Sequence, residues 1–285
     1  MRLIFIPVAD RPECARALQV AFNLGQKLGA SLCGCHIRPH GRSEVSLRTA
    51  LGSFGNDNNA WENAWKGKKT QKSAATARGM FARMAESQNY ELIKNPRITP
   101  GAVWQEKSGS PEKLLSIAGP VSDLIIVSRP SKKGGKIANL FMLAALLNSS
   151  RPVLMLPQSG VPEVGKRISI AWNQSKEAVL AVSATMPLLQ LAEQVTIITS
   201  GSDNELGPKA SQLATYLRFW GVKTVRVRTR DGDDAKALIK AHKAAKSDLL
   251  VMGAYSRSRL TQRIFGGVTE FMLSRADIPV LMLHT

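Results

Sequence analysis

A five-residue hydrophobic sequence, PVLML, occurs twice in this chain, starting at Pro152 and again at Pro279. A second apolar run precedes each copy, and both of these runs begin with Ser-Asp, at Ser122 and at Ser247. In each half one buried strand is thus followed, after a stretch of mixed sequence, by another. This pattern predicts strand, helix and strand twice over.

The two halves also begin alike. Residues 2–37 and residues 167–201 each show an apolar run, an amphipathic stretch with helical periodicity, and a second apolar run. Ser110, just before a proline, marks a helix start in the first half, and Asp233 or Asp234 does so in the second. Apolar strands that alternate with helices are typical of a parallel sheet covered on both faces. We therefore predict an α/β fold with two tandem Rossmann-like, three-layer α/β/α domains.

We place the first domain at residues 1–157 and the second at residues 167–285. The linker at 158–166 has proline and glycine at short intervals and no periodicity. The glycines before Lys166 have the spacing of a phosphate-binding P-loop. A strand follows them where a P-loop needs a helix, so no helix N-terminus could receive a phosphate, and we reject this interpretation.

One predicted strand differs from the others. In the sequence VRVRTR at residues 225–230, arginines alternate with other residues and so share one face. This pattern fits a half-exposed strand at the edge of a sheet, where charge prevents unwanted pairing. A stripe that binds nucleic acid is the alternative interpretation.

The chain is strongly basic, with 39 Lys and Arg against 21 Asp and Glu and a formal net charge of +18. Such a field attracts polyanions. Aromatic residues make up only 6% of the chain and no DNA- or RNA-binding motif accompanies the charge, so we expect only non-specific contact with nucleic acid. No apolar run approaches the roughly 20 residues of a membrane helix, and an odd cysteine count suits a reducing compartment. We expect a cytoplasmic protein that does not contact membranes.

Motifs of catalysis and of metal binding are missing or incomplete. The chain has no nucleophile elbow, dinucleotide-binding loop or zinc-protease motif, so we expect no catalytic residues. Cys33, Cys35 and His36 are close in sequence and are of the residue types that bind metal ions. However, four ligands would be needed, and strand alternation turns His36 away from the two thiols. We interpret both cysteines as core residues and predict no metal site.

The stretch VMGAYSRSRLTQRIFGGVTEFMLSRADIPVLML, at residues 251–283, resembles the C-terminal signature of the universal stress protein family. AWNQSKEAVLAV and VTIIT resemble the beginning of the same domain, so the resemblance covers residues 167–285. Residues 1–157 look like a second, degenerate copy, which makes the chain similar to a tandem universal stress protein. The resemblance implies a five-stranded parallel sheet with strand order 3-2-1-4-5 in each domain. It also implies a loop of pattern G-x-x-G, nine residues, G-(S/T) that binds ATP or AMP, with Mg²⁺ accompanying ATP.

The second half matches that loop in part. Gly253 and Gly266 stand at the first and last glycines, whereas Ser256 replaces the second glycine and Gly267 replaces the hydroxyl residue. Glycines let a backbone approach phosphate closely, and a helix N-terminus directs N–H groups at the anion. By resemblance, the candidate nucleotide-binding residues are Asn173, Thr199, Gly253, Ser256, Arg257, Gly266, Gly267, Val268 and Thr269.

The first half departs further from the pattern. Ser128 stands at its first glycine, Pro130 lies inside the loop, and Ala9 occupies the position of Asn173. An additional segment, residues 38–80, carries Trp61 and a second tryptophan four residues later. Core packing of these rings, a lid and a partner-binding role all remain open.

In relatives, the last strand of each domain pairs with its counterpart in a second domain. We therefore expect the two PVLML strands, from Pro152 to Leu156 and from Pro279 to Leu283, to pair within the chain. A further homodimer stays open. We expect a stress-response protein that binds one adenine nucleotide in its C-terminal domain and has at most weak ATP hydrolysis. The alternative is a scaffold that binds no nucleotide and acts through its basic surface or the 38–80 segment.

Overall fold

The computed structural model describes most of the chain, as two compact units, Met1–Ser149 and Ser150–Thr285. The described residues are 1–38, 68–95, 97–129, 135–160, 163–199, 207–223, 225–229, 235–255 and 267–285. Trp61, Trp65 and Pro130 lie outside them. These units are defined by contacts within the fold and not by the sequence repeat. The first PVLML strand therefore belongs to unit 2, where it pairs with the second.

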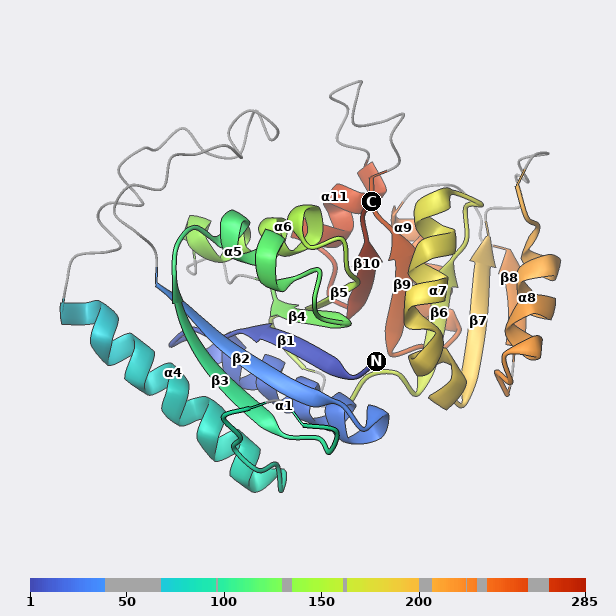
Figure 1. The fold of residues 1–285 in the computed structure, drawn as a ribbon. Coiled ribbons are helices and arrows are strands. Elements are labelled where there is room, and N and C mark those ends of the chain that lie inside the picture. Colours follow the sequence, from blue (N-terminus) through green and yellow to red (C-terminus); the bar gives the residue numbers. More distant parts are fainter. Residues whose placement is uncertain are drawn as a thin grey trace. The chain divides into compact units, whose positions relative to one another are not determined.

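Unit 1 is a parallel sheet with helices on both faces. Its elements are β1 (Leu3–Pro7), α1 (Pro12–Leu28), β2 (Ser31–Arg38), α4 (Lys68–Ser87), β3 (Ala102–Ser108), α5 (Pro111–Ala118), β4 (Leu124–Ser128) and α6 (Gly135–Asn148). The strand order is β3-β2-β1-β4, and every pair is parallel. In Figure 1, α1 and α4 cover one face of these strands, whereas α5 and α6 lie on the other. This order matches the first four positions of the predicted strand order 3-2-1-4-5.

Unit 2 repeats this plan and adds one strand. Its elements are β5 (Val153–Leu156), β6 (Arg167–Ala171), α7 (Lys176–Leu191), β7 (Gln194–Thr199), α8 (Ala210–Phe219), β8 (Val225–Thr229), α9 (Ala235–Ala244), β9 (Leu249–Gly253), α11 (Gly267–Ser274) and β10 (Val280–Leu283). The order is β5-β10-β9-β6-β7-β8. The five strands from β6 to β10 are parallel and follow the predicted order 3-2-1-4-5. No helix among the described residues is long and apolar enough to cross a membrane.

Local sequence signals explain where several helices begin and end, although the predicted start at Asp233 or Asp234 lies outside the described residues. The Ser110 hydroxyl accepts a hydrogen bond from the Lys113 N–H at 3.3 Å, which caps α5 and confirms the predicted start. Ser175 caps α7 in the same way, through the Ala178 N–H at 3.2 Å. Helix α1 ends at Gly29, whose φ of 60° is the left-handed conformation that glycine adopts without strain.

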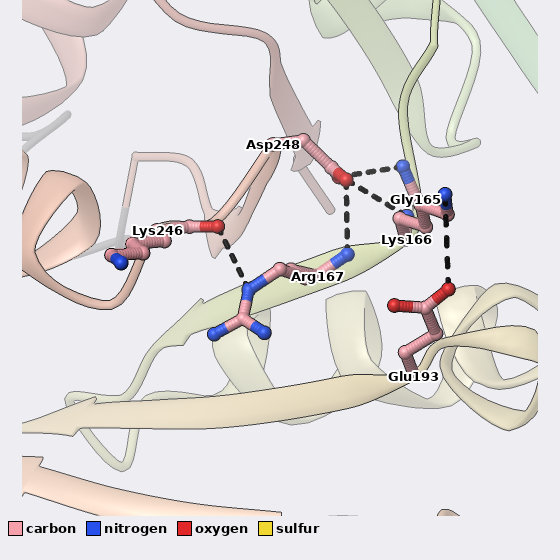
Figure 2. Close-up of polar contacts among 6 residues, drawn as sticks. All are labelled: Gly165, Lys166, Arg167, Glu193, Lys246 and Asp248. Carbon is pink, nitrogen blue, oxygen red and sulfur yellow. Dashed lines mark hydrogen bonds and ion pairs between the residues drawn. The ribbon is translucent and has the colours of Figure 1, made fainter.

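A carboxylate at the start of the fourth strand holds the first strand of each unit. In unit 2, Asp248 accepts hydrogen bonds from the backbone N–H groups of Gly165, Lys166 and Arg167 at 2.7, 3.0 and 3.0 Å (Figure 2). The Asp248 N–H in turn donates to the Arg167 carbonyl at 2.8 Å. Both carboxylate oxygens thus fix the start of β6 beside the start of β9.

Unit 1 uses the same arrangement with a different sequence. The Asp123 carboxylate accepts from the backbone N–H groups of Arg2 and Leu3, and its own N–H donates to the Leu3 carbonyl at 2.9 Å. The aspartate of the Ser-Asp pair that begins each repeated run therefore has one structural role in both halves. Its recurrence supports the interpretation of the chain as two copies of one unit.

This arrangement also explains the glycine spacing that resembles a P-loop. Gly165 has a φ of 89°, a left-handed conformation, and three successive N–H groups there converge on one anion. The anion is the protein's own carboxylate. Because Asp248 accepts from all three donors, the segment holds two strands together and is not a phosphate site.

We expect Asp248→Asn to lower the free energy of unfolding of unit 2 by about 1–3 kcal/mol, because charge-assisted hydrogen bonds are lost at a half-buried site. The matched control is Glu193→Gln. That carboxylate lies 3.8 Å from the Lys166 ammonium in an exposed pair, so its loss should cost less than about 1 kcal/mol (Figure 2). Urea unfolding of both variants measures the difference. Equal stabilities would show that Asp248 is dispensable.

The two PVLML strands pair antiparallel within unit 2, as the repeat predicts. Val280 lies opposite Met155, Leu281 opposite Leu154, and Met282 opposite Val153. Two identical sequences thus meet in opposite directions, with a valine facing a methionine on either side of the central leucine pair. All of these side chains are 0% exposed. The sequence occurs twice because each copy is the complement of the other.

Replacing both Val280 and Met282 by glutamate should destabilise unit 2 by several kcal/mol, because two unpaired charges would be placed in a fully buried strand. Val227→Glu is the matched control, since Val227 lies on strand β8 of the same unit and is 49% exposed. Circular dichroism and urea unfolding report the outcome. Retention of wild-type stability in the double variant would contradict the pairing.

Strand β8 is the edge strand that its sequence predicts. It ends the sheet of unit 2, next to β7, and its residues from Arg226 to Thr229 are exposed. The arginines at 226 and 228 share one face of this strand. The row of charge therefore protects a free sheet edge.

Candidate functional site

Each unit has a topological switch point, where the connections that follow two neighbouring strands run in opposite directions along the sheet. In unit 2 this point lies between β6 and β9, and in unit 1 it lies between β1 and β4. Parallel α/β sheets bind ligands outside the carboxyl ends of the strands at such a point. The residues that follow β6 and β9 in unit 2, and β1 and β4 in unit 1, therefore form the candidate sites.

In unit 2 the structure brings the predicted Asn173, Thr199 and Gly253 to the carboxyl ends of β6, β7 and β9. Asn173 is exposed, and its side-chain oxygen accepts from the Ser175 N–H at 3.2 Å. Asn173 thus supports the turn into α7. Ser256, Arg257 and Gly266 lie outside the described residues.

Gly253 has a packing role that the sequence did not reveal. A side-chain carbon at this position would lie 2.6 Å from the Ala178 backbone nitrogen and 2.7 Å from Glu177. Only glycine allows the first turn of α7 to approach the end of β9 this closely. The first glycine of the loop pattern is therefore explained by packing inside the protein.

Gly267, Val268 and Thr269 form the first turn of α11, and the N–H groups of a first turn have no partner within their own helix, which makes such a turn suited to an anion. Apart from its own neighbours in the helix, no atom of the described residues lies within 4 Å of the position that a side-chain carbon of Gly267 would occupy. Thr269 is half-buried. Among the described residues of the predicted nucleotide site, Gly267 is thus a position with open space beside it.

Acidic and aromatic groups lie at the carboxyl end of β9 and in the first turn of α11. Glu270 lies in the first turn of α11, and Glu177, which is 5% exposed, packs next to Gly253. Burial, and secondarily the charge of Glu270, raise the pKa of Tyr255 to about 12. Its ring contacts His284 edge-on, with centroids 5.9 Å apart. Tyr255 therefore stays neutral at any physiological pH.

Unit 1 contains a cavity of about 520 Å³ at its own switch point, which the sequence did not predict. It lies at the ends of β1, β2 and β4 and under α1, α4 and α6; its lining includes Val8, Ala9, His36, Val127, Phe141 and Met142. Ala9 and Ser128, which we interpreted as marks of degeneracy, both line it. The half that departs further from the nucleotide pattern therefore has a formed cavity.

Comparison with known proteins identifies the second half. The sequence profile of the universal stress protein family matches residues 171–284. The second half of the chain is a universal stress protein domain. A stress response protein of Bacillus subtilis (strain 168), NhaX, is 36% identical over 53 residues. That match spans 19% of this chain and 32% of NhaX.

Solved structures extend the likeness in fold to the first half. A universal stress protein from Archaeoglobus fulgidus matches 99% of this chain and 95% of its own, with a TM-score of 0.68 and 17% identity. A putative universal stress protein from Pseudomonas aeruginosa matches 99% of this chain and 93% of its own, with a TM-score of 0.54 and 15% identity. Both halves thus have the universal stress protein fold.

Cys33 and Cys35 of unit 1 are core residues. Burial raises the pKa of Cys33 to about 11 and that of Cys35 to about 12, and the side chains are 6% and 2% exposed. No group of three or more His, Cys, Asp or Glu side chains in the described ranges could hold a metal ion.

We expect Cys33 and Cys35 to resist N-ethylmaleimide at pH 8 in the folded protein and to react in urea, because the thiolate is the reactive form and burial disfavours it. Mass spectrometry after timed labelling measures this. Rapid labelling of either thiol in the folded protein would show that β2 is open to solvent.

Proposed function

We propose that this chain is a cytoplasmic, non-catalytic universal stress protein whose second half binds one adenine nucleotide, AMP or ATP, with Mg²⁺ accompanying ATP. The observation that supports the proposal most directly is the first turn of α11. Gly267, Val268 and Thr269 begin this helix after β9, at the switch point of a universal stress protein domain. A helix N-terminus in this place favours a phosphate group.

The missing hydroxyl at Gly267 weakens this site. A serine or threonine there would donate one hydrogen bond to the anion, which is worth about 0.5–3 kcal/mol. Its absence corresponds to a loss of affinity of up to about a hundredfold. Backbone N–H groups do not depend on the side chain, so binding should be weak rather than absent.

Charge near the site affects which nucleotide is preferred. Glu177 and Glu270 place two carboxylates near the end of β9 and the start of α11. Carboxylates oppose additional phosphates by like-charge repulsion. We therefore expect AMP to bind at least as well as ATP without Mg²⁺.

Gly267→Ser should raise the affinity for AMP about tenfold, because it restores the hydroxyl at a position with open space. Gly267→Ala is the matched control. It adds the same carbon without the hydroxyl and should leave the affinity close to that of the wild type. Isothermal titration calorimetry with AMP and ATP gives both affinity and stoichiometry, which should not exceed one nucleotide per chain.

Two results would contradict the proposal. One is a stoichiometry of two nucleotides per chain, and the other is equal affinity of the serine and alanine variants. If neither the wild type nor Gly267→Ser binds AMP, the scaffold function becomes the better account. Exposed Arg226 and Arg228 on the free edge of β8 would then be the first surface to test.

A further inference from the structure

The cavity of unit 1 differs in chemistry from a nucleotide site. Most of its wall is apolar, formed by Val8, Ile37, Val127, Phe141 and Met142. Its volume of about 520 Å³ lies within the range of pockets that enclose small molecules. A ligand that fills this space would therefore bury mainly carbon surface.

The end of α1 next to the cavity is a poor anion site. Pro12 opens this helix and has no N–H group. The Arg11 N–H donates to the Ala9 carbonyl at 2.8 Å, and the Cys14 N–H donates to the Arg11 carbonyl at 3.0 Å. The Ser128 hydroxyl also has a hydrogen-bond partner, because it donates to the Glu13 carbonyl at 2.8 Å. Most groups that could bind a phosphate here already have partners.

Charged side chains at the cavity are balanced. Two acids, Asp10 and Glu13, and two bases, Arg11 and Lys72, contribute to the lining. In a chain with a formal net charge of +18, the described residues that line this cavity thus carry no excess of positive charge. This part of the lining therefore gives no electrostatic preference for a polyanion.

His36 is a buried polar residue in the wall of the cavity. Its Nδ1 lies 2.9 Å from the Val8 carbonyl, which can only accept, so Nδ1 carries the hydrogen. In the neutral ring Nε2 is then a hydrogen-bond acceptor. Among the residues that the structure describes, Nε2 has no partner, although the side chain is only 6% exposed and lines the cavity. A ligand donor that reached it would satisfy a polar atom in an apolar wall.

We propose that the first half of the chain binds a neutral, mainly apolar aromatic alcohol, whose hydroxyl group donates a hydrogen bond to Nε2 of His36. The ring would lie against Phe141 and Met142, since aromatic rings and thioethers make favourable contacts. This ligand is distinct from the nucleotide proposed for the second half. Each half would then bind its own class of small molecule.

Two probes of the same size test the role of the hydroxyl group. 2-Naphthol carries the donor, and 2-methoxynaphthalene replaces it with a group that cannot donate. We expect calorimetry to show about tenfold tighter binding of 2-naphthol, the ratio that one hydrogen bond in an apolar site confers. Equal binding of the two probes, or no binding of either, would overturn the proposal.

Labelling of Cys14 locates the bound probe. This thiol lines the cavity and is only half-buried, although burial raises its pKa, so long incubation with N-ethylmaleimide at pH 8.5 should modify it. 2-Naphthol should slow the modification, and AMP should not. Protection by AMP without protection by 2-naphthol would show that the cavity is a nucleotide site.

Two variants separate ligand binding from folding. His36→Phe keeps a ring but removes the acceptor, so the preference for 2-naphthol over 2-methoxynaphthalene should disappear. Because this variant also loses the bond to the Val8 carbonyl, Ala138→Phe is the second variant. Ala138 lines the cavity from α6 and is not fully buried, so a phenyl group can occupy the cavity without an unpaired polar atom. Binding of 2-naphthol should fall at least tenfold in Ala138→Phe, and unchanged binding there would refute this location.

Discussion

In both halves of this protein a carboxylate at the start of the fourth strand accepts hydrogen bonds from the backbone that enters the first strand. Asp248 binds three successive N–H groups and Asp123 binds two. These bonds join strands that are far apart in the sequence but adjacent in the sheet, at the point where the strand order reverses. The carboxyl ends of the same strands carry the candidate sites. The geometry of each site therefore depends on an interaction at the opposite end of its strands.

The two halves share this framework but differ at their sites. Unit 2 keeps a glycine at the end of β9 because α7 packs within 2.6 Å of where a side chain would lie, and it keeps an open first turn on α11. Unit 1 begins α1 with a proline, uses its nearby N–H and hydroxyl groups internally, and opens a largely apolar cavity. One fold thus offers an anion-binding turn in one half and an apolar pocket in the other. The two proposals of different ligands follow from this difference.

Much of the fold was predictable from the sequence because the repeat and the apolar runs are local signals. The paired PVLML strands, the capping serine at position 110 and the arginine-bearing edge strand β8 are confirmed by the structure. The parallel strand order 3-2-1-4-5 came from a family resemblance, because periodicity does not show which strands are neighbours. The carboxylate anchor was missed, since nothing in a Ser-Asp pair reveals which distant backbone it binds.

The sites were less predictable because each depends on contacts between distant residues. Gly253 was interpreted as a ligand-binding glycine, whereas its packing against α7 is visible only in three dimensions. Ala9 and Ser128 were interpreted as losses because they were judged against a nucleotide pattern, and such a pattern cannot indicate a different cavity. The sequence suggests His36 only as a metal ligand to be weighed, and its hydrogen bond to the Val8 carbonyl in the cavity wall is visible only in the structure.

The central claim is that the two halves, although built alike, bind different ligands. Hydrogen–deuterium exchange of the full chain, measured with AMP and separately with 2-naphthol, tests it most directly. AMP should slow exchange of the first-turn amides of α11, around Gly267 to Thr269, and leave the segment from Val8 to Cys14 unchanged. 2-Naphthol should do the reverse. Protection of both segments by AMP would contradict the claim, because it would show two equivalent nucleotide sites.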